Sequence, residues 1–103
     1  MSDCIFCKIA NKEQKADILF EDDNFVAFKD INPKAPIHYL LIPRTHIESI
    51  NSLEDQDLAG QLLLTAKKIA AKLEIKDSGY KLIFNVGRGG GQEVDHLHLH
   101  VLG

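Results

Sequence analysis

Residues 96–102 read HLHLHVL and place three of the chain's five histidines at alternate positions. Alternate side chains of a β-strand share one face, so this run predicts a strand with His96, His98 and His100 on one face and apolar residues toward a core. The strand rise separates neighbouring histidines by about 6.6 Å and the outer pair by about 13 Å. Nitrogen ligands of one zinc ion lie only ~3.4 Å apart. Two neighbours can therefore converge on a metal, but three in line fit one ion poorly.

The row of histidines has three possible explanations. A polar, solvent-facing strand side is one, but histidine is neither a favoured strand residue nor a charged group at pH 7. Metal binding or proton transfer is the second. Nucleophilic attack is the third, because a neutral imidazole can attack phosphorus near pH 7 and form a covalent phosphohistidine. Catalysis by such a site needs neighbouring rings and N–H donors for the phosphate oxygens.

The loop that enters the histidine run is rich in glycine. Residues 87–92 read GRGGGQ, and backbone N–H groups at glycines such as Gly91 can approach an anion closely. The same composition also suits a flexible hairpin connection, so this signal alone is weak. Residues 80–86 before the loop and 96–102 after it predict two strands that pair with each other.

The first half of the chain predicts three more strands. Residues 18–30 (ILFEDDNFVAFKD) favour a β-hairpin around an Asp-Asp-Asn turn. Residues 38–44 favour a third strand that Pro43 ends. The opening of the chain is therefore expected to be mainly antiparallel sheet.

A long helix is expected between the third and fourth strands. Apolar residues recur at three- and four-residue intervals between Ser52 and Ile75, the pattern of one amphipathic helix. Ser52 is the expected cap, with Asp55 three residues later. The order β-β-β-α-β-β predicts an α+β fold with the helix packed on one face of the sheet.

Length and charge limit the possible functions. The 103 residues are expected to form a single domain, residues 1–103, and 45% hydrophobic with 26% charged residues is an ordinary globular composition. A net charge of −3 without any run of Lys or Arg argues against binding a nucleic-acid polymer, which needs many phosphate-neutralising cations. A single nucleotide stays possible as a ligand.

The N-terminal sequence indicates a compartment. MSDCIFCKIANKEQ has neither the basic start nor the continuous apolar stretch of a signal peptide. No apolar run approaches the ~20 residues of a membrane span, so we expect a cytoplasmic protein without membrane contact. Cys4 and Cys7 are then expected to be thiols or metal ligands rather than a structural disulfide.

The histidine run matches the signature of the histidine triad (HIT) family, in which three histidines alternate with apolar residues and two apolar residues follow. The chain further resembles the Hint branch, nucleoside phosphoramidases, and its bacterial members with an N-terminal Cys-x-x-Cys. The resemblance covers nearly the whole chain and rests on CIFCKI (4–9), LFEDD (19–23), AFKDINPKAPIHYLLIPRTHI (27–47), FNVGRGGGQ (84–92) and HLHLHVLG (96–103).

The resemblance implies a fold and a reaction. Each subunit would hold a five-stranded antiparallel sheet, one long helix and a short N-terminal helix, and two sheets would join into one ten-stranded sheet in a homodimer. The implied reaction is hydrolysis of purine nucleoside 5′-phosphoramidates, typically adenosine ones, without an organic cofactor. Two alternatives stay open: a dinucleoside polyphosphate hydrolase, and a zinc-stabilised nucleotide-binding scaffold protein in which turnover is incidental.

The resemblance also implies roles for individual residues. His98 would attack phosphorus and carry the nucleotide, while His100 and His38 would hold the phosphate and assist the leaving group; His96 completes the triad. Asp30 matches the acceptor for the ribose hydroxyls. The residues that would line the base pocket, with core packing as the alternative, are Phe6, Ile9, Phe28, Ile31 and Leu40; those that would lie near the phosphate or the leaving group are Asn85, Gly91, Gln92 and Glu93.

Two further points follow from the resemblance. Some bacterial members with this N-terminus bind a structural zinc through residues that correspond to Cys4, Cys7, His46 and His96. The alternative is two reduced cysteines and a surface histidine. Glu93 stands where animal members often have serine, and its carboxylate would attract a cationic amine leaving group.

Overall fold

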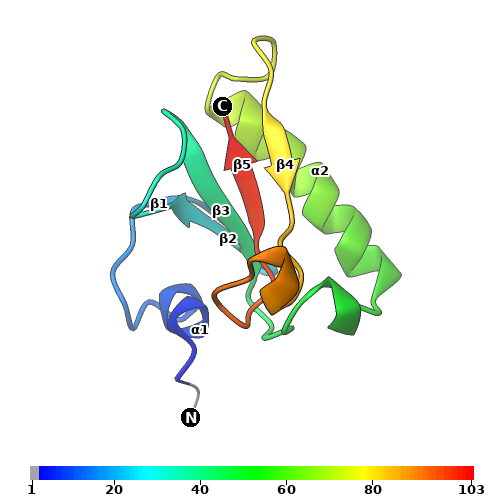
Figure 1. The fold of residues 1–103 in the computed structure, drawn as a ribbon. Helices are drawn as coiled ribbons and strands as arrows, with labels where there is room; N and C mark the ends of the chain where they lie inside the picture. Colours follow the sequence, from blue (N-terminus) through cyan, green and yellow to red (C-terminus); the bar gives the residue numbers. More distant parts are fainter. Residues whose placement is uncertain (1–2) are drawn as a thin grey trace.

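The computed structural model of the protein describes residues 3–103, and the predicted hairpin at residues 18–30 forms within it (Figure 1). Strand β1 (Ile18–Glu21) pairs antiparallel with β2 (Phe25–Lys29). The turn depends on Asp22, whose Oδ1 accepts hydrogen bonds from the backbone N–H groups of Asn24 at 2.8 Å and Phe25 at 2.7 Å. An aspartate that bonds the backbone two residues on is a usual turn former, which explains why the sequence predicted this hairpin correctly.

The other three strands complete one antiparallel sheet in the order β1-β2-β3-β5-β4. They are β3 (His38–Pro43), β4 (Lys81–Ile83) and β5 (Leu99–Leu102). The register places Phe28 opposite Leu40, Leu40 opposite His100, and His100 opposite Ile83. Directly opposed residues face the same side of a sheet, so one cross-strand row joins an aromatic residue of β2 to the last triad histidine.

The two faces of the sheet are covered differently. The long helix α2 (Gln56–Lys72) packs on one face, as predicted, and encloses the larger core, which includes Leu97, Leu99 and Val101, the apolar residues that alternate with the histidines. The short helix α1 (Ile5–Ala10) lies against one end of the other face (Figure 1). The smaller core beneath it consists of Phe6, Ile9, Ala10, Val26, Phe28, Leu40 and Ile42. The histidine face is thus only partly covered.

The predicted start of the long helix is wrong. Helix α2 begins at Gln56, and its cap is Asp55, whose carboxylate accepts a hydrogen bond from the N–H of Leu58 at 3.1 Å. Ser52 instead ends a short 3-10 turn that Ser49 caps. Leu53 is extended between the two, so the apolar pattern runs through a break in the helix that periodicity alone does not reveal.

The last two strands are shorter than predicted, although they pair as expected. Strand β4 stops at Ile83 and β5 begins only at Leu99. Residues 96–98, which were predicted to begin the last strand, bond to the segment after β3 instead. The N–H of Leu97 donates to the carbonyl of Ile47 at 2.6 Å. The chain there bonds to the segment after β3 rather than to a neighbouring strand.

The domain predicted for residues 1–103 starts at two residues that lie outside the described part of the chain. Within residues 3–103, no helix has both the length and the apolar character needed to cross a membrane.

Candidate active site

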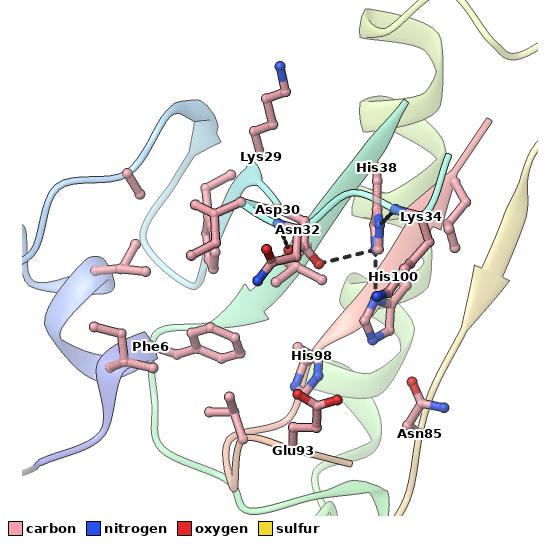
Figure 2. A pocket seen from close by; sticks show the side chains of 18 of the residues that line it. Phe6, Lys29, Asp30, Asn32, Lys34, His38, Asn85, Glu93, His98 and His100 are labelled. Atoms are coloured by element: carbon pink, nitrogen blue, oxygen red, sulfur yellow. Dashed lines mark hydrogen bonds and ion pairs between the residues drawn. The ribbon is translucent and has the colours of Figure 1, made fainter. Parts of the chain in front are cut away.

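His98 lines a cleft of about 850 Å³ on the face of the sheet opposite α2 (Figure 2). Its Nδ1 lies 2.7 Å from the backbone carbonyl oxygen of His96. Because a carbonyl oxygen only accepts, Nδ1 must carry the ring proton and donate it. The neutral ring then has its lone pair on Nε2. His98 is therefore held in the tautomer that a nucleophile needs, and it is only 8% exposed.

His100 and His38 lie next to His98 and contact each other. The His98 and His100 ring centroids are 5.0 Å apart, and Nδ1 of His100 lies 2.9 Å from Nε2 of His38. Burial, together with the neighbouring rings of His98 and His38, lowers the pKa of His100 to about 4, against an opposing effect of Asp30. His100 is therefore neutral at physiological pH, when it can donate one ring proton and accept with the other nitrogen.

The cleft has an apolar end beneath α1. Four of the predicted base-pocket residues line it and are buried: Phe6, Ile9, Phe28 and Leu40. Phe6 packs edge-on against Phe28 and against His98, with ring centroids 5.4 Å and 5.1 Å apart. The fifth, Ile31, stands at the rim and is 90% exposed. An isoleucine left in water beside an aromatic pocket gains from a flat apolar ligand that covers it.

Asp30 lies between the apolar end and the histidines. Its Oδ1 accepts the N–H of Asn32 at 2.9 Å, and its Oδ2 lies 3.3 Å from Nε2 of His38 (Figure 2). The carboxylate lines the cleft and is partly exposed. It can accept further hydrogen bonds from a ligand.

Residues on either side of the glycine-rich loop bring two polar side chains to the cleft, whereas the side chain of Gln92, within the loop, stays out of it. Asn85, Gly91 and Glu93 line the same cleft as His98 (Figure 2). Nδ2 of Asn85 donates to the carbonyl of Gly90 at 2.8 Å, which leaves the amide oxygen as the acceptor it can offer. Gln92 does not line the cleft: its amide is buried and bonds Gly87, Glu48 and Val94.

A second cluster of polar side chains lies outside the cleft lining. The ligand atoms of Cys4, Cys7, His46 and His96 all lie within 4.8 Å of one another. Nε2 of the buried His96 lies 2.8 Å from the carbonyl of Pro43, so it carries the proton, and the lone pair sits on Nδ1. That nitrogen lies 3.3 Å from Sγ of Cys4 and 3.5 Å from Sγ of Cys7. Two sulfurs and two nitrogens at these distances could hold a metal ion.

Burial of His96 favours the neutral form of its ring. It lowers the pKa of the His96 imidazole, and the hydrogen bond to Pro43 opposes the shift. The ring is therefore neutral, the form in which histidine binds metals. His46, from the segment after β3, completes the set with Nδ1 3.3 Å from Sγ of Cys7.

A HIT domain model matches residues 11–103, which include the cleft histidines and the glycine-rich loop. The chain belongs to the HIT domain family. It is 50% identical to Protein HitA of Neisseria gonorrhoeae over 100% of this chain and 97% of that protein. It is 46% identical to the purine nucleoside phosphoramidase of Escherichia coli K12, over 96% of this chain and 85% of that protein.

Solved structures of HIT proteins agree closely with this fold. A HIT family hydrolase from Legionella pneumophila is 50% identical and superposes with a TM-score of 0.95 over 98% of this chain and 92% of its own. A histidine triad protein from Clostridium difficile is 42% identical, with a TM-score of 0.94 over 99% and 90%. The long helix, the short helix and the five-stranded sheet are thus those of the family.

Several residues that line the cleft were not predicted from the sequence of this HIT protein. Ile83 lines the cleft because β4 places it opposite His100, and a correct strand register would have found it. The cationic residues at the cleft are also new: Lys15, Lys29, Lys34 and Lys81. No local motif marks these lysines, since each is set by the path of a loop or strand end. Gln92, predicted at the phosphate, is instead enclosed within the loop.

Proposed function

We propose that this HIT protein hydrolyses purine nucleoside 5′-phosphoramidates, adenosine ones foremost, through a nucleotidyl-histidine on His98. The hydrogen bond from Nδ1 of His98 to the carbonyl of His96 carries the proposal, because it leaves Nε2 with a lone pair toward the cleft. The relative from Escherichia coli named purine nucleoside phosphoramidase supports the same reaction class. Attack by Nε2 would form an N–P bond and break the P–N bond to the amine. Water would then release the nucleotide from His98.

The cleft offers one place for each part of a nucleotide. The base would lie between Phe6, Phe28 and the exposed Ile31, where burial of its faces removes apolar surface from water. The ribose hydroxyls would reach Asp30, since a carboxylate accepts hydrogen bonds from two vicinal hydroxyls. The phosphate would then lie at His98 and His100, the order that follows the row from β2 to β5.

Acceptors near His98 favour an amine leaving group over a polyphosphate. Glu93 presents a carboxylate to the cleft that His98 lines, and Asn85 offers its amide oxygen there. Both attract N–H groups, whereas a carboxylate repels a further phosphate. The lysines at the cleft, Lys81 among them, would attract polyphosphates, so dinucleoside polyphosphate hydrolysis is the activity to compare directly.

We also propose a structural zinc ion, a cytoplasmic location and a homodimer. The four-ligand cluster has the chemistry of a closed tetrahedral zinc site, and reduced thiols suit the cytoplasm. Strand β4 forms one edge of the sheet, and an unpaired edge gains from pairing with a second copy. Exposed leucines nearby in the fold, on β4 and α2, are Leu82, Leu63 and Leu64.

Replacement of the nucleophile tests the reaction. His98→Asn should lower turnover of an adenosine phosphoramidate by about 10³-fold or more while adenosine monophosphate binds within a few-fold of wild type. Mass spectrometry of acid-quenched wild-type enzyme should detect a nucleotidyl adduct that the variant lacks. Retained turnover in the variant would refute the mechanism. A higher rate of wild type on a diadenosine polyphosphate than on the phosphoramidate would favour the alternative reaction.

A further inference from the structure

The loop between β2 and β3 contacts the ring of His38 through one backbone group and one side chain. The N–H of Lys34 donates to Nδ1 of His38 at 2.9 Å. Four residues earlier, Asp30 places Oδ2 3.3 Å from the other ring nitrogen of His38. The N–H of Asn32 holds this carboxylate by its Oδ1. Figure 2 shows these contacts around His38. Both nitrogens of the His38 ring therefore face groups from one short loop.

These contacts determine where the proton of His38 resides. A peptide N–H can only donate, so Nδ1 of His38 must be the nitrogen with the lone pair. The neutral ring then carries its proton on Nε2, the atom beside the negative charge of Asp30. In the opposite tautomer, the N–H at Nδ1 of His38 would point at the backbone N–H of Lys34. His38 is 3% exposed, so water cannot relieve that conflict cheaply.

The tautomer of His38 also determines the tautomer of His100. Nε2 of His38 lies 2.9 Å from Nδ1 of His100. Since Nε2 is the protonated atom, it donates, and Nδ1 of His100 accepts. A neutral His100 must then carry its own proton on Nε2. His100 lines the cleft, so its N–H is the group available to a ligand there.

We propose that the backbone N–H of Lys34 is a positioning group for catalysis, which sets the tautomer of His38 and through it makes His100 a hydrogen-bond donor to the substrate phosphoryl oxygen. This inference rests on the proposed function for the phosphate at His100, but the tautomers themselves are a property of the free protein. A donor aimed at developing negative charge stabilises the transition state, whereas a lone pair in the same place repels it.

The position of the His38 proton also distinguishes the group formed by Asp30, His38 and His100 from the Cys4 cluster. Ligand atoms of Asp30, His38 and His100 lie within 4.8 Å of one another, as those of the Cys4 cluster do. In the Cys4 cluster the proton of His96 points away, to Pro43. In the group of Asp30, His38 and His100, the Lys34 N–H leaves the proton of His38 on Nε2, at the place where a metal ion would need a lone pair. The loop thus favours proton donation over metal binding.

A matched pair of variants at one position tests the proposal. Lys34→Pro removes the N–H, while Lys34→Ala removes only the side chain. Ring ¹H–¹⁵N correlation spectra of the free proteins report the tautomers of His38 and His100. We expect the alanine variant to keep both rings in the Nε2–H form and the proline variant to populate Nδ1–H forms. Unchanged tautomers in a folded proline variant would overturn the proposal.

Kinetics of the same pair provide the functional readout. The proline variant should have a kcat about 10- to 100-fold below that of the alanine variant, with KM within a few-fold. The expected loss is smaller than the roughly 10²–10³-fold of an oxyanion donor removed outright, because His100 stays in place. Equal kcat values despite shifted tautomers would refute the catalytic role. Absence of phosphoramidate turnover in wild type would refute the proposed function alone, since the spectra still test the tautomers.

A second pair covers the case in which the proline variant does not fold. His38→Gln retains an N–H donor near the position of Nε2, and His38→Leu has none. His100 should keep its Nε2–H tautomer beside glutamine and lose it beside leucine. The same His100 tautomer in both variants would contradict the relay from His38.

Discussion

The backbone carbonyl of His96 accepts the Nδ1–H of His98 at 2.7 Å, while the ring of the same His96 lies 3.3 Å from Sγ of Cys4. One residue therefore belongs to both the candidate active site and the Cys4–Cys7–His46–His96 cluster. The His96 ring contacts Pro43 and the sulfurs, and its carbonyl holds the ring of His98, the proposed nucleophile. Displacement of the His96 backbone would change the orientation of the His98 ring.

Loss of one residue of the proposed metal ligand set should lower both the zinc content and the stability of the protein. Cys4→Ser retains the helix cap, because serine accepts the N–H of Cys7 as the sulfur does now, but it removes a thiolate ligand. We expect bound zinc to fall from near one ion per chain and the melting temperature to drop by about 5–10 °C, since each kcal/mol shifts a domain of this size by roughly 4–8 °C.

The control for this variant is Asp3→Ser, an exposed residue next to the cluster but outside it. It should keep the zinc content and melting temperature of wild type. Metal analysis and thermal unfolding with and without a chelator give the two readouts. Purified wild type without zinc, together with an unchanged melting temperature for the cysteine variant, would rule out the metal site.

The depressed pKa of His100 makes the fold sensitive to acid. Its pKa falls from the ordinary histidine value of 6.5 to about 4 in the folded protein. Between these values the unfolded chain binds more protons, so the free energy of unfolding falls as the pH is lowered through this window. His100→Gln removes the group. The stability advantage of wild type over this variant should therefore shrink between neutral pH and about pH 4.5.

Urea unfolding of both proteins across this range measures the effect. Release of a bound metal at low pH affects both proteins alike, so the difference between them isolates His100. Parallel stability profiles would contradict the assignment of the lowered pKa to this residue.

Gln92 should matter for the loop rather than for substrate contact. Its Oε1 accepts the N–H of Gly87 at 2.9 Å, and its Nε2 donates to carbonyls of Glu48 at 2.7 Å and Val94 at 3.0 Å. Gln92→Ala leaves these buried groups unpaired, at a cost of about 1–3 kcal/mol. Gln92→Glu should cost more, because its carboxylate faces two carbonyl oxygens. Denaturant unfolding measures both.

The exposed Gln61 provides a comparison, since it makes one surface hydrogen bond to Asn24. Gln61→Ala should change stability by less than about 0.5 kcal/mol. Equal stabilities of the alanine variants at both positions would show that the buried amide of Gln92 does not hold the loop together.

Glu93 should set a preference among leaving groups. A carboxylate attracts an amine that carries an additional positive charge with about 1 kcal/mol at a separation near 4 Å in water, or about five-fold in rate. Glu93→Gln keeps the shape and removes the charge. We expect the ratio of kcat/KM for a cationic over a neutral amine leaving group to fall by about 3- to 10-fold.

The matched control is Glu13→Gln, which removes an exposed carboxylate that does not line the cleft. Its kcat/KM ratio should equal that of wild type. A Glu93 variant that discriminates between the two amines as wild type does would exclude a role for this charge.

The sequence predicted much of the fold because its patterns are local. Alternating residues indicated the strands, and the Asp22 turn indicated the hairpin. Periodicity placed the helix but missed its start, since the deciding event is one hydrogen bond from Leu58 to Asp55. The strand predicted from His96 begins only at Leu99, because Leu97 bonds to Ile47. Contacts between distant loops leave no local pattern.

The sequence likewise indicated some groups of the candidate site and not others. The histidines and the cysteines are chemically distinctive, and their types and spacing in the sequence are enough to indicate a site, whereas Asp30 was assigned only through the resemblance to the HIT family. The groups that fix the protons are backbone atoms: the carbonyls of Pro43 and His96 and the N–H of Lys34. Nearly every residue has such groups, so residue identity cannot reveal them. Three-dimensional placement is what assigns them a role.

The uneven cover of the sheet has a consequence for ligand binding. The 17-residue helix α2 packs on one face, whereas the other has only the six residues of α1 beside a cleft whose apolar lining includes Phe28 and Leu40. A nucleoside seated there would act as a removable part of the hydrophobic core. Under the proposed function, ligand binding would therefore also add apolar packing to this face of the sheet.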